Sequence, residues 1–200
     1  MLTVENTLET GGIVAAIKNR RSYYDIEKAI PITDTALIEL VDTVTELVPD
    51  SVNMKSAHVV LVLGEKHDLL WDTIFDVFGG KVKRAKIDTF KAGYGTILFF
   101  FDREKVERMS DKYPYSRDKF PIWSMQANAM LQFAMWTALR EKEIGASLQH
   151  YNPVIDDAVK ALFDLPGHWE LNAQMPFGAI GSEPEPKPKE DIRKRVIVKD

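Results

Sequence analysis

The sequence predicts an α+β fold in which helices flank a central mixed sheet. Segments whose apolar residues recur with helical spacing alternate with short, continuous apolar runs that are typical of buried strands. The helical segments contain more residues than the strand segments, which favours the α+β class. The chain contains no internal repeat.

Helix and strand patterns follow one another along the first half of the chain. Residues 13–21 place three apolar side chains on one helical stripe and carry two arginines at its end. A second helix begins at Thr33 or Asp34, either of which can cap it, and Pro49 ends it. The remaining elements predicted here are a strand at 58–64, a helix at 66–78 that two glycines stop, and a strand at 96–101.

One long amphipathic segment dominates the second half. The wide apolar face over residues 122–142 predicts a helix of about 30 Å, at 1.5 Å per residue. A charged helix at 103–112 and a loop at 114–121 precede it, and a strand at 144–149, a helix at 154–163 and a strand at 173–181 follow it.

The last residues differ in composition from the rest of the chain. Residues 183–200 first alternate proline with charge and then end in the β-like run IRKRVIV. Because a proline-spaced segment cannot pack on its own, we expect an arm laid across a partner. The sequence therefore predicts one domain over residues 1–182 and a C-terminal arm over 183–200.

Composition excludes several kinds of chemistry. The chain of 200 residues is 45% hydrophobic and 28% charged, as in globular proteins, and contains no cysteine. Disulfides, thiolate nucleophiles and iron–sulfur clusters are therefore absent, and any redox chemistry needs a borrowed cofactor. The net charge of −4 argues against a nucleic-acid partner. Residues 1–12 do not form a signal peptide and no apolar run approaches 18 residues, so we expect a soluble cytoplasmic protein with no membrane partner.

Common catalytic motifs are missing from the sequence. No glycine-rich dinucleotide fingerprint, phosphate-binding P-loop or G-x-S-x-G elbow occurs. The histidines lie far apart in the sequence and lack metal-ligand spacing, so no metal site is expected: His58, His67, His150 and His168.

Arg20, Arg21 and Ser22 follow the first helical stripe. Two interpretations are open. Cations at the end of a helix stabilise its negative pole, which is the more frequent role for such residues standing alone. Alternatively, the guanidinium groups bind phosphate oxygens through paired hydrogen bonds, and the serine adds a hydroxyl.

Two further polar segments also have a structural and a functional interpretation. The segment PDSVNMKS at 49–56 is either a polar loop or a site where Asn53 and Lys55 reach a ligand ring at the mouth of a strand. A lysine there would stabilise negative charge on a reduced flavin. In the segment GASLQHYNP at 145–153, Asn152 and Pro153 are suited to start a helix, while Gln149 and backbone N–H groups are suited to contact a flavin ring.

These three segments join AGYGTILFF at 92–100 and W-S-x-Q-x-N-A-M at 123–130 in an order that resembles the nitroreductase family. The chain looks most like the small branch that includes the fungal fatty-acid-repression type proteins and related bacterial nitroreductases. The resemblance runs from about residue 13 to the C-terminus, and SLQHYNP at 147–153 is its most specific part.

The resemblance implies a homodimer with a mostly antiparallel sheet and two FMN sites at the subunit interface, each built from both chains. Matched by position, the FMN-binding residues are Arg20, Arg21 and Ser22; Asn53; Gln149, His150 and Tyr151; and, in the arm, Lys187, Lys189 and Arg195. Three departures stand out. Lys55 replaces the usual glutamine, Asp50 replaces a common serine, and Tyr24 replaces a lysine near the flavin pyrimidine, so Lys55 is expected to be the cation on that edge.

The resemblance also implies an activity. NADH or NADPH would reduce the flavin and leave, and an electron-poor acceptor such as a nitroaromatic or a quinone would then take its place in a ping-pong cycle. Protons can come from solvent, so no catalytic side chain is assigned. Aromatic residues between Tyr113 and Trp123 either pack the core or line the substrate side. The alternatives are an FMN-binding regulatory or stress-response protein with incidental reductase activity, and a helical scaffold without cofactor.

Overall fold

The computed structural model describes residues 12–199. The expectation about a signal peptide concerns residues 1–12, and residues 1–11 lie outside the described part. Among the described residues, no helix combines the length and the apolar character that crossing a membrane would require.

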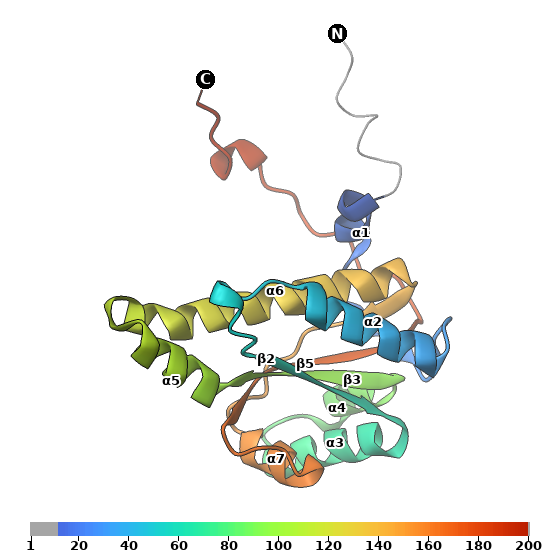
Figure 1. Ribbon diagram of the computed structural model, residues 1–200. Coiled ribbons are helices and arrows are strands. Elements are labelled where there is room, and N and C mark those ends of the chain that lie inside the picture. Colours follow the sequence, from blue (N-terminus) through green and yellow to red (C-terminus); the bar gives the residue numbers. More distant parts are fainter. Residues whose placement is uncertain (1–11, 200) are drawn as a thin grey trace.

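A five-stranded sheet forms the centre of the molecule (Figure 1). Its order is β1-β5-β3-β2, and β4 also pairs with β5. Every strand pair is antiparallel, and the parallel element of the predicted mixed sheet is an isolated bridge between Ser22 and Ala146. The strands are β1 (Ile26–Glu27), β2 (Ala57–Leu63), β3 (Gly95–Asp102), β4 (Ile144–Ala146) and β5 (Trp169–Ile180).

Helices cover both faces of this sheet (Figure 1). Side chains of α2 and α6 form one apolar cluster with the sheet, and side chains of α3, α4 and α7 form a second cluster on the opposite face. This arrangement confirms the α+β expectation. The helices are α1 (Gly12–Asn19), α2 (Asp34–Leu47), α3 (Gly64–Val77), α4 (Arg84–Lys91), α5 (Arg103–Lys112), α6 (Phe120–Glu141) and α7 (Asp156–Phe163).

The central position of β3 explains its continuous apolar run. Ile97 and Phe99 belong to the cluster under α2 and α6, whereas Leu98 and Phe100 belong to the opposite cluster. Successive side chains of a strand point to opposite faces, so a strand with helices on both sides needs apolar residues at every position. The prediction of a buried strand at 96–101 is therefore confirmed.

Several predicted boundaries were wrong. α1 ends at Asn19 rather than at residue 21, and β4 ends at Ala146 rather than at 149. The last helix begins at Asp156, not at 154, so Asn152 is not its cap. β5 begins four residues early, at Trp169, because Trp169 and Leu171 pack into the cluster with α3, α4 and α7 although the polar Glu170 and Asn172 alternate with them.

Further differences concern short elements and the start of α6. The pairing of Ile26 and Glu27 with the end of β5 was not predicted, because two residues carry no detectable periodicity. In the arm, the run IRKRVIV forms a turn of 3-10 helix over Ile192–Lys194 rather than a strand. The loop predicted at 114–121 contains a 3-10 helix over Pro114–Lys119, and α6 starts at Phe120.

Candidate functional site

The segment that follows α1 lies against β4. Ser22 forms the parallel bridge with Ala146, and the backbone N–H of Tyr23 donates to the Ala146 carbonyl over 3.0 Å. Gly145 permits this approach, because a Cβ at that position would lie 3.1 Å from the Cβ of Tyr23 and 2.8 Å from the side chain of Ile180. Three neighbouring residues, Arg20, Arg21 and Ser22, are therefore held at one place beside the 144–149 segment.

Arg20 is half-buried and forms no ion pair with an acidic side chain among residues 12–199. Its guanidinium carbon lies 4.2 Å from the centre of the Trp136 ring and 6.0 Å from that of Phe133. The Nε atom is buried and has no hydrogen-bond partner among the described residues. Burial, followed by the nearby Arg21, lowers the pKa of Arg20 from its ordinary value. A desolvated cation of this kind is stabilised by a bound anion.

The helix-end interpretation of Arg20 does not match this geometry. The carbonyl of Asn19, at the end of α1, accepts a hydrogen bond from Nε of Arg140 at 3.3 Å and lies 3.2 Å from the Tyr23 hydroxyl. The guanidinium of Arg20 instead stacks on α6, and its Nε has no hydrogen-bond partner among residues 12–199. Arg140 has the role that a capping interpretation assigns to Arg20.

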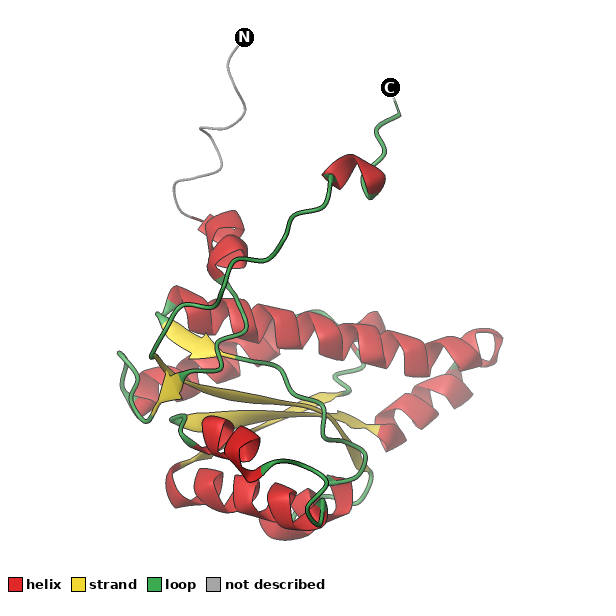
Figure 2. Ribbon diagram, turned by 180° about the vertical axis from the view of Figure 1, so that it is seen from behind, coloured by secondary structure: helices red, strands yellow, loops and turns green. Residues whose placement is uncertain are grey.

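Arg21 contacts the start of the C-terminal arm. Its Nη2 donates to the carbonyl of Glu185 over 2.6 Å, and the Tyr23 hydroxyl donates to Glu183 over 3.1 Å. Beyond this point the arm leaves the body of the molecule (Figure 2), and its three predicted cationic residues are exposed: Lys187, Lys189 and Arg195. Within one chain, the base of the arm reaches Arg21 while its cationic part does not.

The segment after β4 is held by β5. Gln149 exchanges backbone hydrogen bonds of 2.7 and 3.0 Å with Gln174, and the buried Gln174 side chain accepts from the N–H of Tyr151. The Gln149 amide is only 8% exposed and donates to the Ser147 hydroxyl. The Tyr151 ring packs edge-on against aromatic residues of the second cluster, whereas His150 is exposed. Because alternate N–H groups already bond to β5, those of Leu148 and His150 point away from it.

Asn53 and Lys55 lie in a loop between α2 and β2 whose two ends are joined by hydrogen bonds. Oδ2 of Asp50 accepts hydrogen bonds from both the N–H and the hydroxyl of Ser56, each over 2.7 Å. Val52, Asn53 and Lys55 have φ angles of 48°, 52° and 51°, in the left-handed region that non-glycine residues rarely adopt. Nζ of Lys55 forms an exposed ion pair with Glu46.

A pocket of about 240 Å³ lies beside this loop. The loop forms one wall with α2, and β2, α5 and α6 form the others; lining residues include Asn53, Lys55, His58, Lys105, Ala127 and Leu131. Tyr24 is 53% exposed and lines a separate and more open hollow of about 560 Å³. Residues of α4, a helix that the sequence interpretation did not include, line the same hollow.

The arginines and the loop lie on opposite sides of α6 within one chain. Arg20 stacks on Trp136, while Ala127 lines the pocket beside Asn53 and Lys55. Trp136 follows Ala127 by nine residues, which is about two and a half helical turns and therefore half a rotation around the axis. A single chain does not bring the predicted FMN-binding residues together around one ligand.

The aromatic residues that precede and begin α6 are mainly structural. Phe120 is 1% exposed, stacks on Tyr113 and meets Trp123 edge-on. Tyr115 is fully exposed and is not one of the residues of the pocket. The packing interpretation of this segment therefore accounts for most of its aromatic residues.

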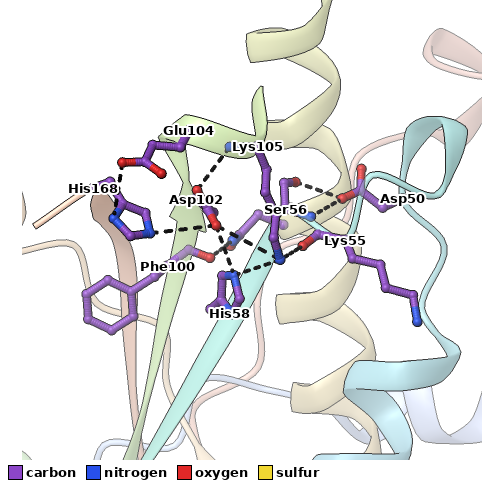
Figure 3. A network of polar contacts seen from close by, with 10 residues as sticks. Asp50, Lys55, Ser56, His58, Phe100, Asp102, Glu104, Lys105 and His168 are labelled. Atoms are coloured by element: carbon purple, nitrogen blue, oxygen red, sulfur yellow. Dashed lines mark hydrogen bonds and ion pairs between the residues drawn. The ribbon is translucent and has the colours of Figure 1, made fainter. Parts of the chain in front are cut away.

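A polar network at the end of β3 was not foreseen (Figure 3). Oδ2 of the buried Asp102 lies 3.6 Å from Nε2 of His58, 3.8 Å from Nε2 of His168 and 4.0 Å from Nζ of Lys105. The sequence interpretation treated the histidines as far apart, but the fold brings two of them to one carboxylate. No spacing in the sequence signals this, because β2, β3 and the start of β5 become neighbours only in the sheet.

The other two histidines stay outside that network. His67 is buried, its Nδ1 lies 3.0 Å from the Thr96 hydroxyl, and burial lowers the pKa of His67 to about 4. His150 is exposed. Among the described residues, no group of three or more potential ligand side chains is arranged to hold a metal ion.

The match to a family model defines the class of this protein. Residues 17–179 match the model of the nitroreductase family. The match covers most of the chain, which therefore belongs to the nitroreductase family of oxidoreductases, as the order of its motifs had suggested.

Individual relatives agree with this assignment. The chain is 28% identical over 182 residues to nitroreductase FRM2 of Saccharomyces cerevisiae, covering 89% of this chain and 93% of that protein. Among solved structures, nitroreductase CinD from Lactococcus lactis in complex with nicotinic acid superposes with a TM-score of 0.89 at 33% identity, covering 94% of this chain and all of that one. A nitroreductase structure from Saccharomyces cerevisiae gives a TM-score of 0.77 at 27% identity, with 84% and 96% coverage.

Proposed function

We propose that this protein is an FMN-dependent reductase that passes electrons from NADH or NADPH to nitroaromatic or quinone-like acceptors. It acts as a homodimer in the cytoplasm, and residues 1–182 form the FMN-binding domain, with 183–200 as an arm to the partner. The observation that carries the proposal is the half-buried Arg20 guanidinium, which stacks on Trp136 and whose Nε has no hydrogen-bond partner in the part of the chain that the structure describes.

The residues around Arg20 fit a phosphate-bearing cofactor. Arg20 and Arg21 provide adjacent guanidinium groups, and Ser22 provides a hydroxyl beside them. Planar guanidinium groups suit phosphate oxygens, and a buried orphaned donor is stabilised when an acceptor binds it. In the same region, the N–H groups of Leu148 and His150 point away from β5 and are suited to the edge of the flavin ring.

The surface of α6 supports a homodimer. Its face away from the core is apolar and exposed, with Ile122 at 51%, Met125 at 44% and Met130 at 47%. A helix that is apolar on all sides belongs in an interior, and contiguous exposed apolar surface marks an interaction site. A second copy packed on this face would bury it.

A dimer also resolves the separation of the site residues. The arginines and the 50–56 loop lie on opposite sides of α6, so the loop of one chain can complete a site only with the arginines of another. Under this proposal Asn53 and Lys55 act across the interface, and the exposed Lys187, Lys189 and Arg195 reach the phosphate in the assembled dimer.

FMN in this site would supply hydride and electron transfer between nicotinamide and acceptor, which would use the same space in turn. Lys55 would then stabilise negative charge on the reduced ring, and protons would come from solvent. Structures of CinD in complexes with nicotinic acid and with 4-nitrophenol support a site that takes both a pyridine ring of the nicotinamide kind and a nitroaromatic acceptor. A putative nitroreductase from Exiguobacterium sibiricum in complex with FMN, whose fold matches with a TM-score of 0.72, supports the cofactor.

An absorption spectrum followed by anaerobic titration tests the proposal. The purified protein is expected to show flavin absorbance, to bleach with NADH or NADPH, and to recover when a nitroaromatic or a quinone is added. Flavin absorbance that neither nicotinamide bleaches would favour an FMN-binding regulatory protein. Colourless protein that does not bind added FMN would contradict both.

A further inference from the structure

The 50–56 loop has a conformation that needs continuous support. Val52, Asn53 and Lys55 all have positive φ angles, and such residues remain in place only where the surroundings over-determine them. Met54 anchors the middle of the loop in a small apolar cluster with Val106 and Phe120. The double contact between Asp50 and Ser56 closes the loop, but it leaves the carbonyl of Lys55 to be held by another group.

Lys105, from the first turn of α5, holds that carbonyl. Its Nζ donates to the carbonyl oxygen of Lys55 over 2.8 Å and lies 3.2 Å from Nε2 of His58. The ammonium group is also 4.0 Å from Oδ2 of the buried Asp102. When His58 is neutral with its proton on Nδ1, the Nε2 lone pair accepts from Lys105, so two acceptors and one carboxylate fix the ammonium in place (Figure 3).

We propose that Lys105 is a positioning residue that locks the 50–56 loop in the conformation that presents Asn53 and Lys55 to FMN, and that protonation of His58 releases this lock. The inference rests on the proposed function for the role of FMN. A protonated His58 cannot accept from the Lys105 ammonium, repels it, and becomes the better partner for Asp102, 3.6 Å away. Lys105 then loses Nε2 of His58 as an acceptor and competes with His58 for the carboxylate of Asp102. Its hydrogen bond to the Lys55 carbonyl therefore becomes weaker.

The surroundings of His58 set the direction of the pH dependence. Burial, followed by the positive charge of Lys105, lowers the pKa of His58, and the nearby Asp102 opposes that change. The lock therefore stays closed at neutral pH and opens only below the ordinary range of histidine. The charged and titratable groups that face His58 or its pocket, from every packed element, are Asp102, Glu104, Lys105, His168, Glu46, Asp50 and Lys55.

The variant Lys105→Met tests the lock, with Lys112→Met as a matched control. Lys112 lies on the same helix, and its ammonium is over the Tyr113 ring rather than in the network. We expect Lys105→Met to weaken FMN binding about 10-fold, as for the loss of one charged hydrogen bond. Amide hydrogen exchange at residues 53–56 of the free protein is expected to become faster, and Lys112→Met should change neither quantity.

Lys105→Arg and His58→Phe separate positioning from general stability. Arginine keeps a cation that can donate to the Lys55 carbonyl, so Lys105→Arg is expected to restore slow exchange and most of the FMN affinity. Phenylalanine retains the ring that stacks on Trp169 at 4.1 Å but does not titrate. The wild type should lose FMN affinity relative to His58→Phe as the pH falls from 7.5 to 4.5, a range that extends below the ordinary pKa of histidine. Comparing the two proteins at each pH cancels the titration of the FMN phosphate itself.

The outcomes distinguish this inference from the proposed function. Unchanged exchange at residues 53–56 in Lys105→Met would overturn the lock, whether or not the protein binds FMN. Faster exchange with no FMN binding in any variant would keep the lock and reject the proposed function. If Lys105→Met does not fold, an FMN affinity whose pH dependence is the same in the wild type and in His58→Phe would still overturn the proposal.

Discussion

The two halves of the candidate site differ in how complete they are. Around Arg20, the backbone is firmly attached to β4, but the guanidinium is half-buried and its Nε has no partner among the described residues. In the 50–56 loop, the backbone is strained; Oδ2 of Asp50, Ser56 and the Lys55 carbonyl have partners, whereas Oδ1 of Asp50 is buried without one among the described residues. A buried donor without a partner is suited to bind an anionic ligand, whereas a loop whose closing contacts are already made is suited to position other groups.

This difference assigns separate roles to the two regions. The arginine region is expected to contribute binding free energy directly, because the anion would accept from a buried donor that lacks a partner among the described residues. The loop is expected to contribute mainly geometry, since its closing contacts through Oδ2 of Asp50, Ser56 and the Lys55 carbonyl are already made. Variants in the arginine region should therefore lower FMN affinity, whereas Ser56→Ala in the loop should have a smaller effect, on the free energy of unfolding.

The largest effect is expected on the exposed apolar face of α6, where the proposed dimer brings the arginine region of one chain to the loop of the other. Met130→Glu would place a charge in the apolar face of α6, where Met130 is 47% exposed. If that face is the dimer interface, two copies of an unpaired charge would be buried, and dimer affinity should fall by about 100-fold or more. Sedimentation or elution volume measures the dimer, and flavin absorbance measures the loss of FMN that should accompany it.

Leu69→Glu is the control for this variant. Leu69 is exposed to a similar extent, at 44%, but lies on α3 on the other side of the sheet. Leu69→Glu should change neither the dimer affinity nor the flavin absorbance. A Met130→Glu protein that stays dimeric and yellow would reject α6 as the interface and with it the shared site.

A smaller but still large loss is expected in the arginine region. Arg20→Met keeps the apolar contact with Trp136 and removes the charge, so FMN affinity should fall about 10- to 100-fold, the range for a charged hydrogen bond. Fluorescence titration measures it. Arg117→Met, which removes a cation from an exposed pair with Asp111, is the control. Equal FMN affinity in Arg20→Met and the wild type would show that the orphaned guanidinium serves another purpose.

Deletion of residues 183–200 tests the link between the arm and the arginine region. The truncation removes the Glu185 carbonyl that Arg21 binds, together with Lys187, Lys189 and Arg195. FMN affinity is expected to fall about 10-fold, comparable to the loss of one charged contact, and the dimer is expected to weaken. Retained flavin absorbance together with an unchanged elution volume would speak against a role for the arm.

The smallest effect is expected in the loop. Ser56→Ala removes one of the two donors to Oδ2 of Asp50 and leaves the backbone N–H in place. The free energy of unfolding should fall by about 0.5–1 kcal/mol, at the low end for one hydrogen bond, because the backbone N–H still donates to Oδ2. Urea denaturation measures this change. A loss as large as that of a buried ion pair would mean that the loop supports far more of the fold than its own contacts indicate.

The strands and long helices were predictable because their signals are local. The continuous apolar run of β3 and the wide apolar face of α6 each indicate an element type without knowledge of its neighbours. Thr33 was correctly predicted as a possible cap, and its side chain accepts from the N–H of Ala36. The two-residue β1 and the early start of β5 were missed, since pairing with distant strands rather than periodicity creates them.

The sequence alone determined which residue types were available: adjacent arginines after a helix, no cysteine, and a set of motifs in the order of one family. The tertiary structure decided which of them meet. It placed Arg20 and Lys55 on opposite sides of α6, and it brought His58 and His168 to Asp102. Secondary structure depends on neighbours a few residues apart, whereas these encounters depend on the register of a sheet whose strands are far apart in the chain.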